Sequence, residues 1–384
     1  MSRYKMSDVA VEINERENSP ATSKYDRFVG LEHYVSGDVI IRNFGSTERL
    51  ESTMKVFQNG DVLVARRNVY LKRASMVDFD GLTSGDSIVL RAKDPVIGRI
   101  LPFVLNTDEF WDFADQYSDG TMSKRLSPKT LMKYEFDLPA EDELEAFADL
   151  LWAANDTKEA YQALLRQTDE LVKSQFIEMF GDPVENEKEW PLVRLDELAE
   201  IKIGPFGSLL HKEDYIENGH ALVNPSHIVD SKIVIDPKLT ISDEKYDELS
   251  SYALRIGDVI LGRRGEMGRC AVVYEEGLVC GTGSMIIRPG TEMKPYFLQN
   301  IISSPAYRRV IEGKAVGVTM MNLNAPTVSS FMIPKLPVKL QEEYLEFVNQ
   351  SDKSKLAALQ ASKFLRKGID YNYNHDFRRM KNVH

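Results

Sequence analysis

Two pairs of adjacent arginines stand at similar places in the two halves of the chain. Arg66-Arg67 follows the segment Gly60-Asp-Val-Leu-Val-Ala65, and Arg263-Arg264 follows Gly257-Asp-Val-Ile-Leu-Gly262. A guanidinium donates paired hydrogen bonds to the O6 and N7 atoms of guanine and also binds phosphate. The pairs are therefore candidates for nucleic-acid contacts. The alternative is that they form salt bridges on the protein surface.

Further polar residues near the arginine pairs are candidates for the same kind of contact. Carboxamides such as those of Asn322 and Asn324 can read the edge of an adenine, although Asn is also common in loops. Lys124 and Arg125 hold the corresponding place in the first half. The further candidate DNA-contacting residues are Asn68, Lys72, Arg73, Lys124, Arg125, Arg269, Thr319, Asn322 and Asn324.

A glycine-rich stretch in the second half could bind phosphate through its backbone. It comprises Gly204, Pro205, Phe206, Gly207 and Ser208. Successive backbone N–H groups in such a loop can face an anion, but the stretch lacks the Gly-Lys-Ser/Thr ending of a nucleotide-binding loop. We keep Gly204, Phe206, Gly207 and Ser208 as candidate DNA-binding residues, with an ordinary turn as the alternative.

The sequence lacks the common catalytic motifs. It has no Gly-x-Gly-x-x-Gly fingerprint, no Walker motif, no His-Glu-x-x-His and no Asn/Asp-Pro-Pro-aromatic tetrapeptide of amino-methyltransferases. Asn224-Pro-Ser-His227 departs from that tetrapeptide at its third and fourth positions. Glu312-Gly-Lys314 resembles the end of a metal-nuclease motif, but three residues are a weak signal. We expect no catalytic residues in this chain.

We expect no metal site and no disulfide framework either. The two cysteines, Cys270 and Cys280, are too few for such a framework, and the six histidines do not form a zinc-type cluster. His33 and His227 fall at equivalent places in the two halves, which favours a shared packing or turn role over metal binding.

The charge of the chain is unevenly distributed. The 384 residues are 43% hydrophobic and 28% charged, with a formal net charge of −11. The segment 141–189 holds 14 acidic and 4 basic residues, so it carries nearly all of this excess, and the remainder is close to neutral. The acidic total therefore does not exclude nucleic acid as a partner. No apolar run reaches the roughly 18 residues of a membrane span, and residues 1–24 lack a signal peptide, so we expect a cytoplasmic protein.

The most informative feature is an internal repeat. Four blocks recur in the same order, and their separations grow slowly from 189 to 197 positions. The strongest pair joins the segments beginning at Gly60 and Gly257, which are 197 positions apart. Constant order with slowly growing separation indicates duplication with small loop insertions.

Each copy has the pattern of an α+β domain. Short β-branched and aliphatic runs, such as 39–41, 62–65 and 88–90 in the first copy, lie between Gly, Asp and Asn turns and predict strands. Apolar spacings of three and four then predict helices, as in 296–302 and 305–311.

A long helix is expected after each copy. From Pro139, apolar residues recur at multiples of seven, at Leu144, Leu151 and Val172 among others, until Gly181 and Pro183 stop the helix. A similar pattern follows Pro337. We expect the two helices to pack on each other as an antiparallel coiled coil, and the alternative is that each caps its own domain. The expected domains are 1–138, 139–183, 184–337 and 338–384.

The pattern resembles the specificity subunit of type I restriction-modification systems, in which two target recognition domains alternate with two helical conserved regions. The likeness covers nearly the whole chain. It is carried by 195–204 with 206–208, by 254–261 with 268–272, and by 321–324 leading into 333–337 and Gln341. The first copy departs from this pattern, with Asn14-Glu-Arg-Glu17 and Thr121-Met-Ser-Lys-Arg-Leu126, as reading a different half-site would require.

The resemblance implies a subunit that recognises DNA and leaves the chemistry to its partners. Each target recognition domain would read one half of a split target, and the helices would set the number of unread bases and dock two methyltransferase subunits. Those subunits would bind S-adenosylmethionine and methylate adenine at N6, with ATP-dependent restriction subunits as a further partner. No cofactor is expected on this chain. The alternatives are a scaffold that binds protein partners through its duplicated domains and, more remotely, a nuclease using Glu312 and Lys314.

Overall fold

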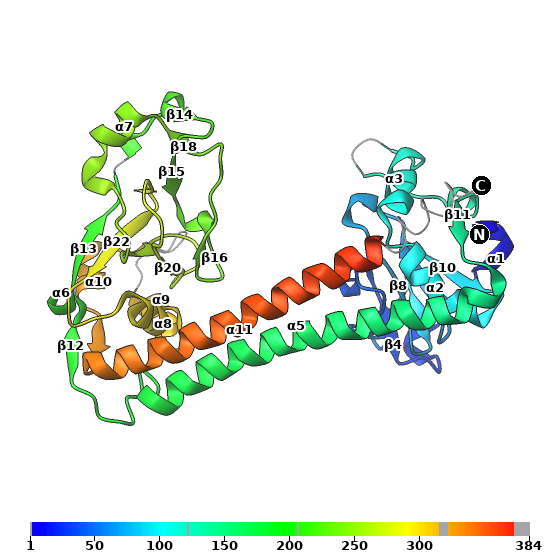
Figure 1. The fold of residues 1–384 in the computed structure, drawn as a ribbon, viewed down its shortest axis with the longest axis horizontal. Helices are drawn as coiled ribbons and strands as arrows, with labels where there is room; N and C mark the ends of the chain where they lie inside the picture. The colour runs from blue at the N-terminus through cyan, green and yellow to red at the C-terminus, as the bar shows by residue number, and fades with distance from the viewer. Residues whose placement is uncertain (1, 121–122, 206, 315–321, 372–384) are drawn as a thin grey trace. The chain divides into compact units, whose positions relative to one another are not determined.

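The computed structural model describes residues 2–120, 123–205, 207–314 and 322–371, except for the side chains of residues 358 and 361–371. The chain forms two compact units (Figure 1). Unit 1 comprises residues 1–163 and 359–384, and unit 2 comprises residues 164–358. None of the helices within the described ranges is both long and apolar enough to cross a membrane.

Unit 1 is built on two sheets and a short ribbon. The first sheet has the order β2 (Ala10–Ile13), β10 (Ser87–Ala92), β7 (Val62–Ala65), β8 (Ala74–Met76). The second has the order β3 (Arg16–Glu17), β6 (Met54–Phe57), β9 (Gly81–Thr83), β4 (Arg27–Val29), β5 (Gly45–Ser46). The ribbon pairs β1 (Ser2–Lys5) with β11 (Glu135–Leu138). The short helices are α1 (Met6–Val9), α2 (Pro95–Val104), α3 (Asp108–Gln116) and α4 (Pro128–Leu131).

Unit 2 repeats this plan. Its first sheet has the order β13 (Ala199–Ile203), β22 (Ser284–Pro289), β19 (Val259–Gly262), β20 (Cys270–Val272). A second sheet has the order β14 (Tyr215–Ile216), β18 (Thr240–Ile241), β15 (His220–Val223), β21 (Val279–Cys280). Two ribbons pair β16 (Ile228–Val229) with β17 (Lys232–Ile233), and β12 (Leu192–Arg194) with β23 (Met332–Pro334). The short helices are α6 (Leu195–Leu198), α7 (Asp243–Glu248), α8 (Pro295–Ser303), α9 (Pro305–Lys314) and α10 (Ala325–Ser329).

The register of the first sheet is the same in both units. Leu63 pairs with Val89 in unit 1, and Ile260 pairs with Ile286 in unit 2. Each residue of the second pair lies 197 positions after its counterpart, and we call residues separated in this way equivalent. The strand order is also the same, so the internal repeat and the α+β fold class are confirmed.

The second sheets differ more than the first. Each contains one parallel pair, β4 with β9 and β15 with β21, but the remaining strands follow different orders. One expected strand is wrong: residues 39–41 make only an isolated bridge from Ile40 to Met76. Because Val39 and Ile41 are buried while Ile40 is half-buried, this apolar run fills the core without joining a ladder.

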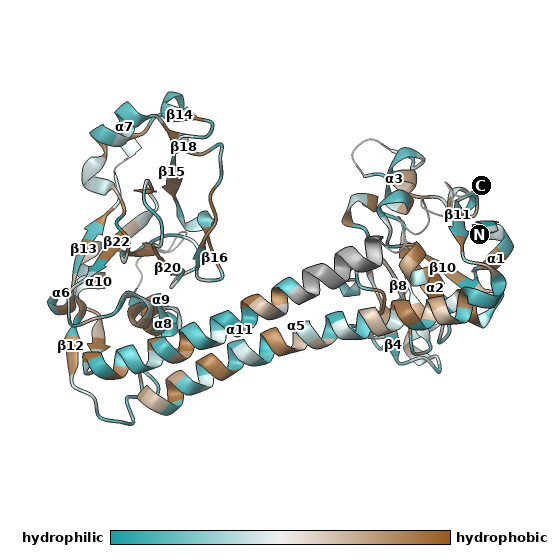
Figure 2. Ribbon diagram, in the orientation of Figure 1, coloured by the Kyte–Doolittle hydropathy of each residue, from teal (hydrophilic) through white to brown (hydrophobic). Residues whose placement is uncertain are grey.

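Two long helices complete the fold, α5 (Leu144–Phe180) and α11 (Val338–Tyr371). A short 3₁₀ turn, Glu141–Glu143, precedes α5, and Gly181 with a φ of +76° follows it, as the glycine stop predicts. Apolar and polar residues alternate along α5 (Figure 2). Leu144, Ala148 and Leu151 enter the core of unit 1.

The last turns of α5 and the first turns of α11 pack on each other within unit 2. The Tyr344 hydroxyl donates to the backbone oxygen of Val172 at 3.3 Å, and the Tyr344 ring lies 5.5 Å from the Phe176 ring. Further along, Lys355 pairs with Asp169 at 2.6 Å. Residue numbers rise on one helix as they fall on the other, so the two segments are antiparallel. The expected contact between the helices is confirmed in this unit.

Candidate nucleic-acid interface

The Gly-Asp segment of the repeat has a structural role. Asp61 and Asp258 are each 1% exposed and accept paired hydrogen bonds from Arg91 and Arg288, at 2.7 and 2.8 Å in unit 1 and at 2.8 Å twice in unit 2. Each carboxylate also accepts the backbone N–H three residues earlier at 2.8 Å. These hydrogen bonds close the turn before the strand, so the most repeated sequence block stabilises the fold.

The first arginine of each pair ties its strand to a distant segment. Nε of Arg66 donates to the backbone oxygen of Leu126 at 3.2 Å, and Nε of Arg263 donates to that of Leu323 at 3.1 Å. Desolvation by burial is the main cause that lowers the pKa of both guanidiniums. Both side chains are half-buried, so these arginines hold the site together more than they extend from it.

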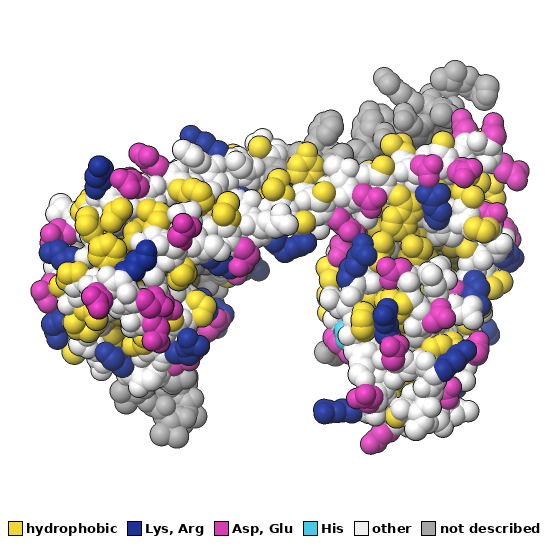
Figure 3. Space-filling model, turned by 90° about the horizontal axis from the view of Figure 1, so that it is seen from below, with side chains coloured by type: hydrophobic (Ala, Val, Ile, Leu, Met, Phe, Trp, Pro, Cys, Tyr) yellow, Lys and Arg dark blue, Asp and Glu magenta, His cyan; other side chains and the backbone are white. Residues whose placement is uncertain are grey.

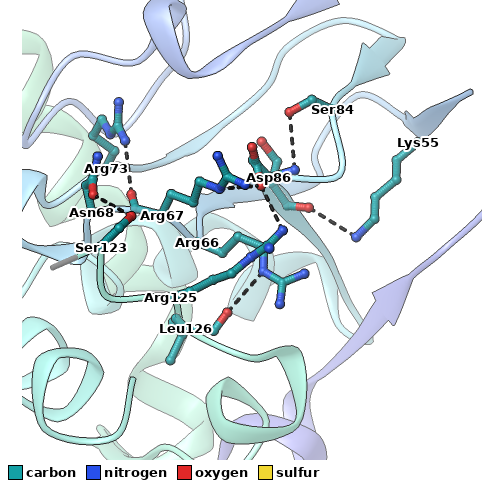
Figure 4. A network of polar contacts seen from close by, with 11 residues as sticks. Lys55, Arg66, Arg67, Asn68, Arg73, Ser84, Asp86, Ser123, Arg125 and Leu126 are labelled. Carbon is teal, nitrogen blue, oxygen red and sulfur yellow. Dashed lines mark hydrogen bonds and ion pairs between the residues drawn. The ribbon is translucent and has the colours of Figure 1, made fainter. Parts of the chain in front are cut away.

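The second arginine of the first pair belongs to a polar cluster of unit 1 (Figure 4). Nε of Arg67 lies 3.1 Å from Oδ1 of Asp86, and Nη2 of Arg125 donates to the same oxygen at 2.8 Å. Arg67 and Arg125 also form an isolated antiparallel bridge. Lys55 lies beside this cluster, with its amino group donating to the Ser87 backbone oxygen at 3.1 Å. The Asp86 carboxylate is therefore paired with two guanidiniums.

The equivalent place in unit 2 has a different composition. Arg264 bridges to Asn322 as Arg67 bridges to Arg125, but Gly283 stands where unit 1 has Asp86. Arg264 is exposed and has no ion pair with any residue that the structure describes. Oδ1 of Asn322 is buried and lacks a hydrogen-bond partner in the same set of residues. Arg264 is thus the more available of the two arginines.

Asn324 has a structural role that accounts for part of its side chain. Its Oδ1 accepts the backbone N–H of Thr327 at 2.8 Å and so caps α10. The equivalent Ser127 caps α4 in the same way, accepting from Thr130 at 3.1 Å. A proline follows each cap within two residues, which is a sequence signal for the start of a helix.

The remaining basic candidates of unit 1 are mostly paired with carboxylates or backbone oxygens. Lys72 lies 2.5 Å from Asp108, and Lys124 lies 2.6 Å from Asp115. Arg73 donates to the backbone oxygens of Leu31 at 3.0 Å and of Arg67 at 3.1 Å.

Two further candidates are also held by contacts within the fold. Asn68 accepts a hydrogen bond from Ser123 at 3.0 Å. In unit 2, Arg269 is paired with Glu266 through a hydrogen bond of 2.8 Å from its Nε. Oδ1 of Asn68 and Nε of Arg269 therefore already have hydrogen-bond partners within the protein.

Gly204, the first residue of the glycine-rich stretch, is explained by packing and not by phosphate binding. A Cβ on this buried residue would lie 2.2 Å from the Gly281 oxygen, so close backbone packing explains the glycine. Gly207 and Ser208 are exposed in a 3₁₀ turn, Gly207–Leu209, and remain candidates. Phe206 and Thr319 lie outside the described residues.

His33 and His227, which are 194 positions apart in the repeat, both contact the backbone of a turn, one of the two roles expected for them. Nδ1 of His33 accepts the backbone N–H of Gly30 at 2.9 Å. Nδ1 of His227 lies 3.2 Å from the backbone nitrogen of Asn224 and 2.8 Å from the backbone oxygen of Leu222. Lys314 lies over the Phe331 ring at 5.6 Å. Among the described residues, no group of three or more His, Cys, Asp or Glu side chains is arranged to hold a metal ion.

The surface of the molecule carries charge of both signs. Lys and Arg side chains are interspersed with Asp and Glu on the face seen in Figure 3. The functional candidate that sequence reasoning missed is Asp86, which joins Arg67 to Arg125. The signal for it was a mismatch: within an otherwise similar block, the equivalent residue is Gly283.

Comparison with known proteins finds similarity to one curated protein and to several solved structures. No family model matches the chain. A protein of Methanocaldococcus jannaschii, described as the specificity subunit of type I restriction enzyme MjaX, is 23% identical over 173 residues. That match covers 43% of this chain and 40% of the length of the relative.

Two solved structures cover nearly the whole chain. One, from a study of complex assembly and conformational transition of the type I restriction-modification system, has a TM-score of 0.58 at 18% identity, covering 98% of each chain. The other is the type I restriction-modification S subunit from M. genitalium, with a TM-score of 0.55 at 13% identity, covering 97% of this chain and 94% of that one. The resemblance seen in the sequence is thereby confirmed, and the chain has the fold of type I restriction-modification specificity subunits.

Proposed function

We propose that this chain is the DNA specificity subunit of a type I restriction-modification complex. Its two copies, 1–138 and 184–337, would each read one half of a bipartite target. The observation that carries the proposal is a pair of domains with the same first-sheet order and an arginine pair after the same strand, but with different polar neighbours. A common scaffold with different contact residues suits two different half-sites.

The polar neighbours of the second arginine differ between the two copies, as expected if the copies bind different DNA sequences. In the first copy Arg67 and Arg125 share the carboxylate of Asp86, whereas Arg264 in the second copy stands beside the carboxamide of Asn322. Arginine donors suit guanine, and a carboxamide suits adenine. The two half-sites are therefore expected to differ in base composition.

This chain would recognise the DNA, and its partner subunits would catalyse the reaction. We expect two methyltransferase subunits to dock on the long helices, to bind S-adenosylmethionine and to methylate adenine at N6 after turning the base out of the duplex. ATP-dependent restriction subunits would be a further partner. This role implies a non-catalytic chain acting in the cytoplasm, where the DNA is.

Methylation mapping tests the proposal directly. Cells carrying the methyltransferase subunits are compared with and without this chain, and modified adenines are located by single-molecule sequencing. The expected result is an asymmetric motif of two short parts separated by unread bases, present only with the chain. A methylation pattern that does not depend on the chain would contradict the proposal and favour a scaffold for other proteins.

A further inference from the structure

The carboxylate of Asp86 lies between two arginines that come from separate segments of the first copy. Its Oδ1 lies 3.1 Å from Nε of Arg67 and 2.8 Å from Nη2 of Arg125. The Asp86 side chain is 25% exposed, against 50% for Arg67 and 41% for Arg125. The acid is thus the most buried of the three side chains, and both arginines remain partly exposed.

The position of Asp86 is itself held by the backbone. The Asp86 oxygen accepts the Arg66 N–H at 2.9 Å, and the Asp86 N–H donates to Oγ of Ser84 at 3.2 Å. Leu126 N–H also donates to the Arg66 oxygen at 2.8 Å, which fixes the segment that carries Arg125. The carboxylate therefore sits at a defined place relative to both arginines.

The contact uses only part of each guanidinium. Arginine has five N–H donors, and Arg67 turns its Nε toward Asp86, so the donors of its terminal nitrogens are not used by this ion pair. Two donors of one guanidinium are enough to bind O6 and N7 of guanine. A guanidinium already oriented by a carboxylate loses less conformational freedom on binding.

We propose that Asp86 is a positioning residue that sets the recognition of guanine in the half-site read by the first copy. It acts by orienting Arg67 and Arg125 and does not itself need to touch DNA. This inference rests on the proposed function and adds a base type and a residue to it.

The second copy has no carboxylate at the place equivalent to Asp86, and the reason is structural. A Cβ on the equivalent Gly283 would lie 2.9 Å from Cδ and 3.2 Å from Cγ of Pro225, so a side chain does not fit there without a shift. Arg264 consequently has no carboxylate in the corresponding place. The copies are expected to differ in how strictly they read a guanine at this contact.

The test compares Asp86→Asn with the wild-type chain in complex with its methyltransferase subunits. First, methylation mapping gives the target, and Arg67→Ala identifies the half-site read by the first copy. Binding constants are then measured by fluorescence anisotropy for the target and for duplexes with each base pair of both half-sites replaced. For Asp86→Asn, discrimination at a guanine of the first half-site should fall roughly tenfold, with the second half-site unchanged.

Two further variants separate positioning from a structural role. Glu266→Gln is the matched control, because Glu266 of unit 2 also joins two arginines, Arg269 and Arg308, and its loss should leave the first half-site unchanged. Asp86→Glu keeps the charge and should retain part of the discrimination. The melting temperature of Asp86→Asn should stay close to that of the wild type, because this ion pair is partly exposed.

Several results would overturn the inference. Unchanged discrimination in Asp86→Asn would do so, as would a first half-site without guanine. A uniform rise in affinity for all duplexes would show that Asp86 only neutralises charge, and a uniform loss with a lower melting temperature would show that it only stabilises the fold. Absence of any chain-dependent methylation motif, in contrast, would contradict the proposed function itself.

Discussion

Arg264 and Arg67 occupy equivalent places after the same strand, but of the two only Arg67 has a carboxylate partner in the described part of the chain. An exposed, unpaired guanidinium at a strand end can bind either a base edge or a phosphate. Those two roles are distinguished by how a substitution affects different sequences. A base contact changes the preference at one position, whereas a phosphate contact changes affinity for all sequences alike.

We predict that Arg264→Ala alters only the half-site read by the second copy. If Arg264 contacts a base, discrimination there should fall by about 1–3 kcal/mol. If it contacts phosphate, affinity should weaken uniformly and the salt dependence should become shallower by about one unit. Anisotropy titrations at several salt concentrations measure both quantities.

The matched control for this prediction is Arg255→Ala. Arg255 is also an exposed arginine, but it precedes β19, whereas Arg264 follows that strand. Its removal should leave DNA binding unchanged. A loss of recognition in Arg255→Ala as large as in Arg264→Ala would contradict the placement of the interface.

Asp258 is a second residue whose role can be measured by itself. It is 1% exposed, and its substitution by Ala would leave both the Arg288 guanidinium and a backbone N–H without their acceptor. Because Arg288 is 27% exposed, water can partly replace the lost partner. We predict that Asp258→Ala lowers the free energy of unfolding by about 2–3 kcal/mol.

Urea denaturation followed by circular dichroism measures this loss, and Asp61→Ala should cost a similar amount in unit 1. The control is Asp243→Asn, since Asp243 is 93% exposed although it lies 3.1 Å from His220. No measurable change is expected there. If Asp258→Ala unfolded at the same urea concentration as the wild type, the proposed role of the repeated Gly-Asp turn would be wrong.

At the scale of elements, the contact between α5 and α11 in unit 2 centres on Tyr344. This side chain is fully buried and lies 5.5 Å, centroid to centroid, from the rings of both Phe176 and Phe180. Phe297 of α8 packs on the same two phenylalanines. The helices are therefore anchored to the core of unit 2 and to each other by one aromatic cluster.

We predict that Tyr344→Ala destabilises the protein by about 3–5 kcal/mol, because it leaves a cavity in this cluster. Tyr344→Phe should cost only about 1 kcal/mol, since it removes the hydrogen bond to Val172 and keeps the ring. Leu356→Ala, at a position of α11 that is 57% exposed, is the control with little expected effect. Equal unfolding midpoints for Tyr344→Ala and Leu356→Ala would contradict this account.

At the scale of the whole molecule, α5 is a continuous helix from Leu144 to Phe180 that enters the cores of both units. If the helix sets the number of unread bases, its length should appear in the DNA target. Seven added residues lengthen a helix by roughly 10 Å, which equals about three base pairs at roughly 3.4 Å per pair. Seven is also close to two turns, so the faces of the helix stay nearly in phase.

We predict that seven residues inserted after Ala163 increase the spacer of the methylated motif while both half-sites stay the same. Methylation mapping reads the outcome. An insertion of equal length after Glu276, in the exposed turn before β21, should leave the motif unchanged. An unaltered spacer after the α5 insertion would contradict the role of this helix as a ruler.

Much of this organisation was already determined by the amino-acid sequence. The duplication, the α+β class, the helix end at Gly181 and the shared role of His33 and His227 all follow from local signals or from repetition. Such signals can be recognised in the sequence because turns, caps and periodic apolar faces depend on residues that are close together in the chain. They need no knowledge of which distant segments meet.

Only the tertiary structure decided which polar side chains are engaged with each other. Asp86 meets Arg125 across 39 positions, and Asn324, a candidate for reading adenine, caps a helix with part of its side chain. Residues 39–41 read as a strand because they are apolar, yet their backbone finds almost no ladder. Whether a polar group pairs with another residue or remains open to a ligand depends on contacts between distant segments, and those contacts exist only in the folded chain.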